Sequence, residues 1–123
     1  MKNVLVTGGF GFIGFNALLD WVPKFPDCRF FNMDCETYAA QFKLEDKKAM
    51  LRLLGVESFK KSIADPVICE KIVKDCSIDT IVNFAAESHV DNSIASPSIF
   101  FETNVIGTAN LLDAARKFNC RFH

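Results

Sequence analysis

Short, almost entirely apolar runs alternate with amphipathic stretches along this chain. Apolar runs of this length are typical of strands buried on both faces of a parallel sheet, and the amphipathic stretches are typical of covering helices. The pattern predicts an α/β fold, a Rossmann-type doubly wound parallel sheet truncated after about four strands. We expect the strand order 3-2-1-4, with strands at residues 3–7, 28–33, 58–64 and 79–86 and the start of a fifth at 120–123.

Proline and glycine mark the ends of the predicted helices. A first helix is expected from Phe12 to about Val22, closed by Pro23. A shorter helix is expected over residues 46–54, with Gly55 as its stop. The longest helix opens at residues 96–97 and ends before Asn119, and its helical spacing predicts one apolar face made of Phe101, Val105, Thr108, Leu112 and Ala115.

Composition restricts the function classes. A length of 123 residues suits one domain, 1–123. With 14 Lys and Arg against 15 Asp and Glu, the net charge of −1 offers no basic field for a nucleic acid. Five cysteines without a C-x-x-C pair favour free thiols in a reducing cytoplasm over a metal site. The uncharged run 3–19 is interrupted by four glycines, so we expect neither a leader peptide nor a membrane span.

A glycine-rich turn, Thr7-Gly-Gly-Phe-Gly-Phe-Ile-Gly14, stands between the first strand and the first helix. Gly11 and Gly14 complete G-x-G-x-x-G with Gly9, and G-x-x-G-x-x-G with Gly8. Such glycines permit a tight turn, close approach of a pyrophosphate and close packing of helix on strand. The helix N-terminus then faces the phosphates with free N–H groups and a favourable dipole.

Asp34 lies 20 residues beyond Gly14, at the end of the second predicted strand. A carboxylate there binds ribose hydroxyls and repels a 2′-phosphate, so it favours NAD over NADP. The alternative, an aspartate that only initiates a loop, is less consistent with this spacing. Two roles stay open for Asp65 beside Pro66: a structural cap of the next helix, and a hydrogen bond to adenine as well.

The segment after the fourth predicted strand, Ala85-Ala-Glu-Ser-His-Val-Asp91, carries four polar side chains in five residues. Ligands of open α/β sheets bind at such strand ends, and the two alanines permit close approach of a cofactor. His89 taken alone is better explained as a hydrogen-bonded structural histidine. Thr103 and Asn104 are poor helix formers, and either a surface position or a cofactor contact explains them.

Together these motifs resemble the extended short-chain dehydrogenase/reductases, and among them the nucleotide-sugar 4,6-dehydratases. The glycine motif is shared by the whole superfamily, whereas the Ala-Ala-Glu-Ser-His-Val-Asp segment is more specific and is most similar to the dTDP-glucose 4,6-dehydratases. Asn92 also resembles the UDP-glucose 4,6-dehydratases, which leaves the nucleotide base open. The resemblance spans the chain through residues 7–14, 34, 37–39, 65, 83–91 and 102–108.

The resemblance implies NAD as cofactor and a nucleotide sugar as substrate. Carried over by position, Phe12 and Ile13 would cover the pyrophosphate, residues 34–37 would line the adenosine ribose, and residues 65–66 would border adenine. Ser88 would also reach the sugar nucleotide. The implied cofactor-binding residues are Gly8, Gly11, Phe12, Ile13, Gly14, Asp34, Cys35, Glu36, Thr37, Asp65, Pro66, Phe84, Ala85, Ala86, Glu87, Ser88 and Thr103.

In that family, bound NAD⁺ takes a hydride from sugar C4, water is lost across C5 and C6, and the hydride returns to C6. A Tyr-x-x-x-Lys pair and a threonine drive the oxidation, and an Asp-Glu pair drives the dehydration. The one tyrosine here is Tyr38, and position 42 is Phe. The chain resembles about the first third of such an enzyme, so we expect no catalytic residue within it and no turnover by it alone.

Two alternatives remain. Another extended reductase, such as a 4-epimerase, is disfavoured by the Glu-Ser-His-Val-Asp segment, and a truncated nucleotide-binding module without chemistry is favoured by the missing pair. The fourth predicted strand would present an open edge, and the helix face around Phe100, Phe101 and Val105 would lack partners. We therefore expect a homo-oligomer or an edge-paired assembly.

Overall fold

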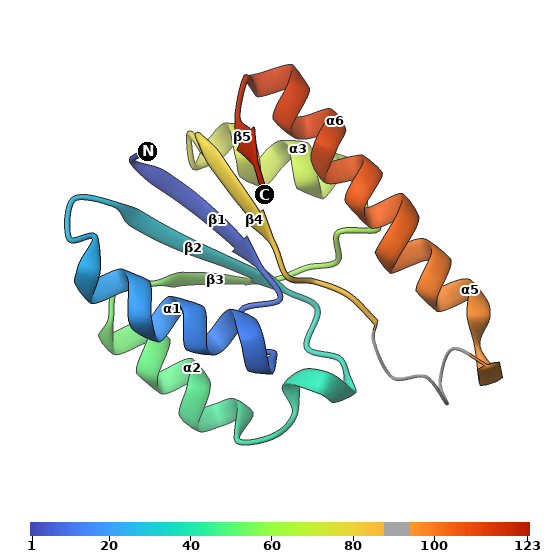
Figure 1. Ribbon diagram of the computed structural model, residues 1–123, viewed down its shortest axis with the longest axis horizontal. Helices are drawn as coiled ribbons and strands as arrows, with labels where there is room; N and C mark the ends of the chain where they lie inside the picture. The colour runs from blue at the N-terminus through green and yellow to red at the C-terminus, as the bar shows by residue number, and fades with distance from the viewer. Residues whose placement is uncertain (88–93) are drawn as a thin grey trace.

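The computed structural model describes residues 1–87 and 94–123. Within these residues, parallel strands form one sheet in the order β3-β2-β1-β4-β5, which confirms a Rossmann-type α/β fold (Figure 1). The order contains the expected 3-2-1-4 arrangement, and a fifth strand lies within the segment 120–123 where its start was expected. The strands are β1 (Asn3–Thr7), β2 (Arg29–Asp34), β3 (Glu57–Lys60), β4 (Thr80–Asn83) and β5 (Arg121–Phe122).

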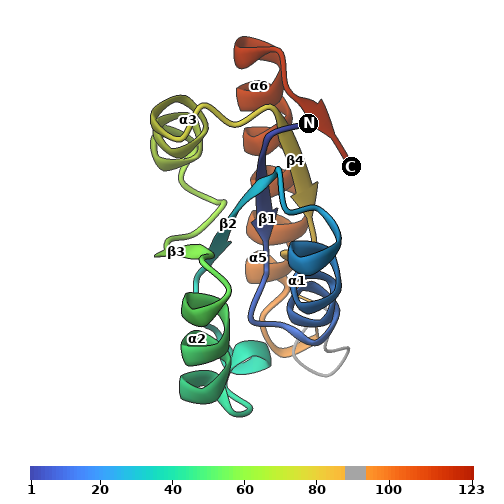
Figure 2. The same ribbon diagram turned by 90° about the vertical axis from the view of Figure 1, so that its left-hand side faces the viewer.

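Helices cover both faces of this sheet. In Figure 2, α3 and α6 occupy the upper half of the molecule and α1 and α2 the lower half, with the strands between them. None of the helices in the described part of the chain is long and apolar enough to cross a membrane. The helical elements are α1 (Phe12–Lys24), the 3-10 turn η1 (Tyr38–Ala40), α2 (Leu44–Leu53), α3 (Pro66–Asp75), α5 (Pro97–Phe100), the π-helix η2 (Phe101–Gly107) and α6 (Thr108–Phe118).

The pleat of the strands divides the core into two layers, because successive side chains point to opposite faces. Leu5 of β1 packs with buried residues of α3 and α6, whereas Val4 and Val6 pack with buried residues of α1 and α2. Both sets of side chains are almost completely buried. The nearly continuous apolar sequence of β1 is therefore explained by burial on both faces.

Several predicted boundaries need correction. The first helix does not close at Pro23 but continues to Lys24, because the proline φ suits a helix and the Phe25 N–H still bonds to the Trp21 carbonyl, 2.9 Å away. The third strand is four residues long, β3 (Glu57–Lys60), and not the seven-residue span 58–64. The short helix, α2, begins at Leu44, two positions before its expected start.

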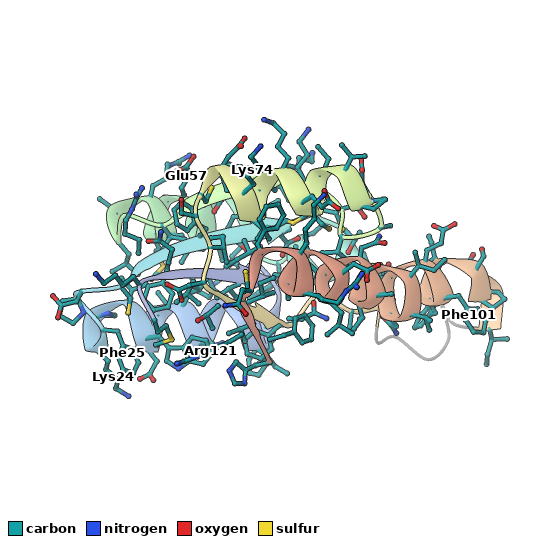
Figure 3. The ribbon with its side chains drawn as sticks, turned by 90° about the horizontal axis from the view of Figure 1, so that it is seen from above. Lys24, Phe25, Glu57, Lys74, Phe101 and Arg121 are labelled. Atoms are coloured by element: carbon teal, nitrogen blue, oxygen red, sulfur yellow. The ribbon has the colours of Figure 1, made fainter. Side chains whose placement is uncertain are left out.

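The predicted apolar face of the longest helix, residues 97–118, is correct at Ala115 but wrong at three other positions. Phe101, Val105 and Leu112 are 65%, 58% and 47% exposed. Besides Ala115, the buried positions are Gly107, Leu111 and Ala114, none of which was predicted. The π-helical segment causes this change, because its wider turns rotate the helix faces relative to a continuous 3.6-residue repeat. Figure 3 shows Phe101 on the part of the helix that projects beyond the sheet.

The open edge expected at the fourth strand is covered. β5 pairs with β4 in parallel, with Thr80 opposite Arg121 and Ile81 opposite Phe122. Two further backbone bonds extend the ladder, from the His123 N–H to the Ile81 carbonyl at 2.9 Å and from the Asn83 N–H to the His123 carbonyl at 2.8 Å. The sheet therefore does not end after four strands, and edge pairing through β4 is not expected from this structure.

Candidate functional site

A cleft lies at the carboxyl ends of the strands, where open α/β sheets bind ligands. The space between its walls, including the part open to solvent, is about 520 Å³. Its walls come from the glycine-rich turn, the end of β2, the segment after β3, the segment after β4 and one residue of η2. The lining residues are Gly8, Gly11, Met33, Asp34, Cys35, Thr37, Ala40, Lys61, Ser62, Ile63, Phe84, Ala85, Ala86, Glu87 and Thr103.

Two glycines of the turn have positions that a side chain would not tolerate. Gly8 has a φ of +71°, and a Cβ there would lie 2.8 Å from the backbone nitrogen of Ala85. A Cβ on Gly14 would collide with the carbonyl oxygen of Gly8. The turn thus packs α1 and the segment after β4 against the same backbone, which explains the glycine spacing in the sequence.

The N-terminus of α1 is open toward solvent. Gly11 is its N-cap and supplies no side-chain cap, and the first turn carries no acidic residue. Phe12 and Ile13, the next two residues, are 83% and 64% exposed. The first N–H groups of a helix have no partner within the helix, so this end suits an anionic group such as a pyrophosphate.

A buried polar residue that sequence analysis missed forms a hydrogen bond with the backbone of the glycine-rich turn. Asn32, in the middle of β2, is fully buried. Its Oδ1 accepts the Gly9 N–H at 2.9 Å, and its Nδ2 donates to Ser58 Oγ at 3.3 Å. An amide inside an otherwise apolar strand was the available signal, because buried polar groups need partners.

Asp34 reaches the cleft from the end of β2 and is 7% exposed. Its carboxylate accepts the Phe10 N–H at 2.9 Å and the Glu36 N–H at 2.7 Å. Burial raises the pKa of Asp34 above its ordinary value, and these two hydrogen bonds partly oppose that change. The carboxylate is therefore held rigidly by backbone groups on one side while it lines the cleft on the other.

Glu36 does not line this cleft. Its backbone has a φ of +58°, and its nearly buried carboxylate contacts Lys48 Nζ at 2.9 Å and Lys60 Nζ at 3.5 Å. The hydrogen bond with Glu36 raises the pKa of Lys48. Cys35 and Thr37, on either side of Glu36, do line the cleft.

Asp65 caps α3, as expected. Its Oδ1 accepts the N–H groups of Val67 and Ile68 at 3.0 and 3.2 Å, with Pro66 at the first helical position. Neither Asp65 nor Pro66 lines the cleft. The residues that do so from this region, Lys61, Ser62 and Ile63, directly follow β3 and were not identified from the sequence.

The segment after β4 is bound to the π-helix. Asn104 Oδ1 accepts the Glu87 N–H, and Asn104 Nδ2 donates to the Glu87 carbonyl, both at 2.9 Å. On the β1 side, the Ala85 N–H donates to Thr7 Oγ1 at 3.2 Å. A structural role therefore explains Asn104, whereas its neighbour Thr103 lines the cleft. The expectations for Ser88 and for His89 lie outside the described residues.

Comparison with known proteins identifies the family. The family model described as GDP-mannose 4,6 dehydratase matches residues 5–123. A dTDP-glucose 4,6-dehydratase of Mycobacterium tuberculosis is 40% identical over 122 residues, which are 98% of this chain and 35% of that relative. The chain thus spans about a third of the length of the curated relatives it matches.

Two solved structures are similar to this chain over nearly its whole length. A double mutant of a dTDP-glucose 4,6-dehydratase from Streptomyces venezuelae, with NAD bound, matches with a TM-score of 0.83 and 35% identity, over 98% of this chain and 37% of that chain. A UDP-glucose 4-epimerase from Thermus thermophilus, in complex with NAD, matches with a TM-score of 0.79 and 27% identity, over 96% and 35% of the two chains. Because the family model covers the chain from residue 5 to its last residue, this chain belongs to the GDP-mannose 4,6 dehydratase family.

Proposed function

We propose that this chain is the NAD-binding portion of a nucleotide-sugar 4,6-dehydratase that acts on dTDP-glucose. The observation that carries the proposal is the cleft itself, in which the glycine-rich turn and the Asp34 carboxylate meet at the strand ends. The identity of 40% to dTDP-glucose 4,6-dehydratases supports this substrate over UDP-glucose. Such an enzyme is a lyase that forms a 4-keto-6-deoxy sugar.

The cleft suggests how each part of NAD is held. The Asp34 carboxylate accepts hydrogen bonds from the adenosine ribose, with Cys35 and Thr37 beside it. Backbone N–H groups at the start of α1, in residues 11–14, bind the pyrophosphate. Lys61, with its neighbours Ser62 and Ile63, borders the adenine, and Asp65 orients this segment as the cap of α3.

The nicotinamide end of the cofactor lies against the segment after β4. Phe84, Ala85, Ala86 and Glu87 line this end of the cleft together with Thr103. Ser88 is proposed to contact the nucleotide sugar. Bound NAD⁺ would supply the hydride acceptor and donor, and these residues would orient the nicotinamide. We expect no turnover by the chain alone, because Tyr38 is followed four positions later by Phe42 and not by lysine.

Calorimetric titration of NAD⁺ into the 123-residue protein tests the proposal. We expect saturable binding that Asp34→Ala weakens, because the substitution removes the acceptor for the ribose hydroxyls. Asp20→Ala, which removes an exposed carboxylate on α1, is the matched control and leaves the affinity unchanged. Absence of NAD⁺ binding by the folded protein contradicts the proposed cofactor site.

A 4-epimerase is the second candidate, since the Thermus thermophilus epimerase has a similar fold and an NAD complex. The two activities differ in product. A dehydratase converts dTDP-glucose to a 4-keto-6-deoxy sugar, whereas an epimerase returns a hexose inverted at C4. Analysis of the products formed by a complete enzyme that contains this chain distinguishes them.

We also propose self-association through the exposed apolar side chains of the longest helix, Phe101, Val105 and Leu112. A second copy that covers these exposed side chains would remove them from water, which favours association. Light scattering at micromolar concentration is expected to give a mass above that of the monomer, and a monomeric mass contradicts it. We place the protein in the reducing cytoplasm, in agreement with its five free cysteines.

A further inference from the structure

Glu36 lies at a junction between the cleft and a neighbouring groove. Asp34 and Cys35 line the cleft, whereas Glu36 lines a groove that it shares with Lys48 and Lys60. The Glu36 N–H donates to Asp34 Oδ1 at 2.7 Å, so the turn that carries Glu36 is attached directly to the ribose-binding carboxylate. The backbone of Glu36 is therefore adjacent to the proposed cofactor site, although its side chain lines the neighbouring groove.

The Glu36 side chain is occupied by two cations from different elements. Lys48 reaches it from α2 at 2.9 Å, and Lys60 reaches it from the end of β3 at 3.5 Å. The Glu36 side chain is 7% exposed, against 27% for Lys48 and 72% for Lys60. Lys60 also stands directly opposite Asp34 in the β2–β3 register. Two ammonium groups thus converge on the Glu36 carboxylate, two residues after the carboxylate that is proposed to bind the ribose.

These charges bear on which cofactor the site accepts. A phosphate on the 2′-oxygen of a ribose held by Asp34 would approach the turn that carries Glu36, whose N–H donates to Asp34 Oδ1. Lysine ammonium groups are good phosphate ligands when no carboxylate neutralises them. In this chain Glu36 already accepts both, and its own charge adds to the repulsion from Asp34.

We propose that Glu36 is a specificity-determining residue that masks a 2′-phosphate subsite formed by Lys48 and Lys60. The inference rests on the proposed NAD site and adds a second acidic determinant to Asp34. Asp34 acts by contact with the ribose, whereas Glu36 acts through the two lysines. Removal of the Glu36 charge is therefore expected to improve binding of 2′-phosphorylated adenosine without loss of the unphosphorylated form.

Two small probes isolate this effect, because they need only the adenosine half of the site. Calorimetry is carried out with 5′-AMP and with adenosine 2′,5′-bisphosphate on the wild-type chain and on Glu36→Gln, which keeps the size and the backbone N–H of Glu36. We expect the bisphosphate to bind on the order of tenfold more tightly to Glu36→Gln than to the wild type, from one fewer negative charge at close range. Binding of 5′-AMP is expected to stay unchanged.

Glu45→Gln is the matched control. Glu45 also contacts Lys48, at 3.8 Å, but its side chain is 84% exposed. An exposed ion pair of this kind is weak, so its loss is expected to leave the affinity of both probes unchanged. A gain in bisphosphate affinity equal to that of Glu36→Gln would mean that only the net charge of the protein matters, which overturns the inference.

Lys48→Gln provides an independent variant with the opposite sign. It leaves Glu36 less neutralised, so we expect weaker bisphosphate binding, and in combination with Glu36→Gln we expect it to abolish the gain. If 5′-AMP binds and none of these variants alters the preference between the probes, the inference is wrong and the NAD site stands. If neither 5′-AMP nor NAD⁺ binds the folded wild type, the proposed function fails and the inference fails with it.

Discussion

Substitution of Gly14 by alanine tests the close packing of α1 on the glycine-rich turn. A Cβ at this position would lie closer than 3.0 Å to both the carbonyl oxygen and the carbonyl carbon of Gly8, and 3.0 Å from Gly9 Cα. These are backbone atoms of a turn that cannot rotate away as a flexible side chain does. Forced overpacking costs about 1–3 kcal/mol, and the upper end applies to a rigid neighbour.

An opposing contribution must be subtracted. Gly14 lies within α1, where alanine is more favourable than glycine by about 1 kcal/mol. The expected net loss in the free energy of unfolding is therefore about 2 kcal/mol. For a chain of this size, that loss lowers the urea midpoint by about 1 M. Urea denaturation followed by circular dichroism measures it, and calorimetry with NAD⁺ shows whether the displaced turn still binds the cofactor.

Gly11→Ala is the control in the same turn. A Cβ on Gly11 would lie 3.3 Å from the Gly8 oxygen, and its φ of −72° suits any residue. Its expected cost is about 0.5–1 kcal/mol, from a poorer N-cap. If Gly14→Ala is as stable as the wild type, or less damaging than Gly11→Ala, the packing explanation of the third glycine is wrong.

Three further predictions concern Asp34 in the cleft and two residues, Asp65 and Asn104, that hold segments next to it. Because Asp65 caps α3, Asp65→Ala is expected to lower the free energy of unfolding by about 1 kcal/mol, whereas Asp65→Ser, which keeps a capping oxygen, is expected to lose much less. Urea denaturation measures both losses, and equal losses would refute the cap. Asn104→Leu leaves the Glu87 N–H and carbonyl without their partner and is expected to cost about 1–3 kcal/mol, with faster hydrogen exchange at the Glu87 amide; an unchanged exchange rate would contradict this. The pKa of Asp34 in the folded protein is raised above 3.8, so the folded state binds a proton at Asp34 more tightly than the unfolded chain does. Protonation of Asp34 therefore stabilises the fold increasingly as the pH falls through the raised pKa toward 3.8. NAD⁺ affinity is expected to fall over that same window as the ribose acceptor is protonated, and calorimetry across this pH range should show the fall in the wild type and a flat profile in Asp34→Asn.

Much of the fold could be predicted because its determinants are local in sequence. The apolar runs predict β1 and β2, and the glycines between β1 and α1 predict a tight turn, each from residues that are neighbours in the sequence. The Asp65-Pro66 start of α3 was identified for the same reason, since a cap acts on N–H groups two and three residues away. The positions of Asp34 and of the alanines after β4 followed from the rule that parallel strands end at a common edge.

The errors arose where distant segments decide the outcome. The fifth strand was expected at residues 120–123, but its parallel pairing with β4, which covers the edge expected to be open, was not, because pairing depends on a contact between distant segments. The buried side of α6 depends on the π-helical turns before it, which a regular 3.6-residue repeat does not anticipate. The bonds of Asn32 and the contacts of Glu36 with lysines from α2 and β3 are tertiary, so no spacing in the sequence encodes them.

The π-helical segment η2 has a mechanical consequence for the longest helix. On its C-terminal side, Leu111, Ala114 and Ala115 are embedded in the core. On its N-terminal side, α5 contains no buried residue. The continuous helix in Figure 1 therefore consists of two parts with different burial, joined by π-helical turns in place of regular α-helical ones. We expect the amides of α5 to exchange with solvent through local opening, while those of α6 exchange only when the whole sheet unfolds.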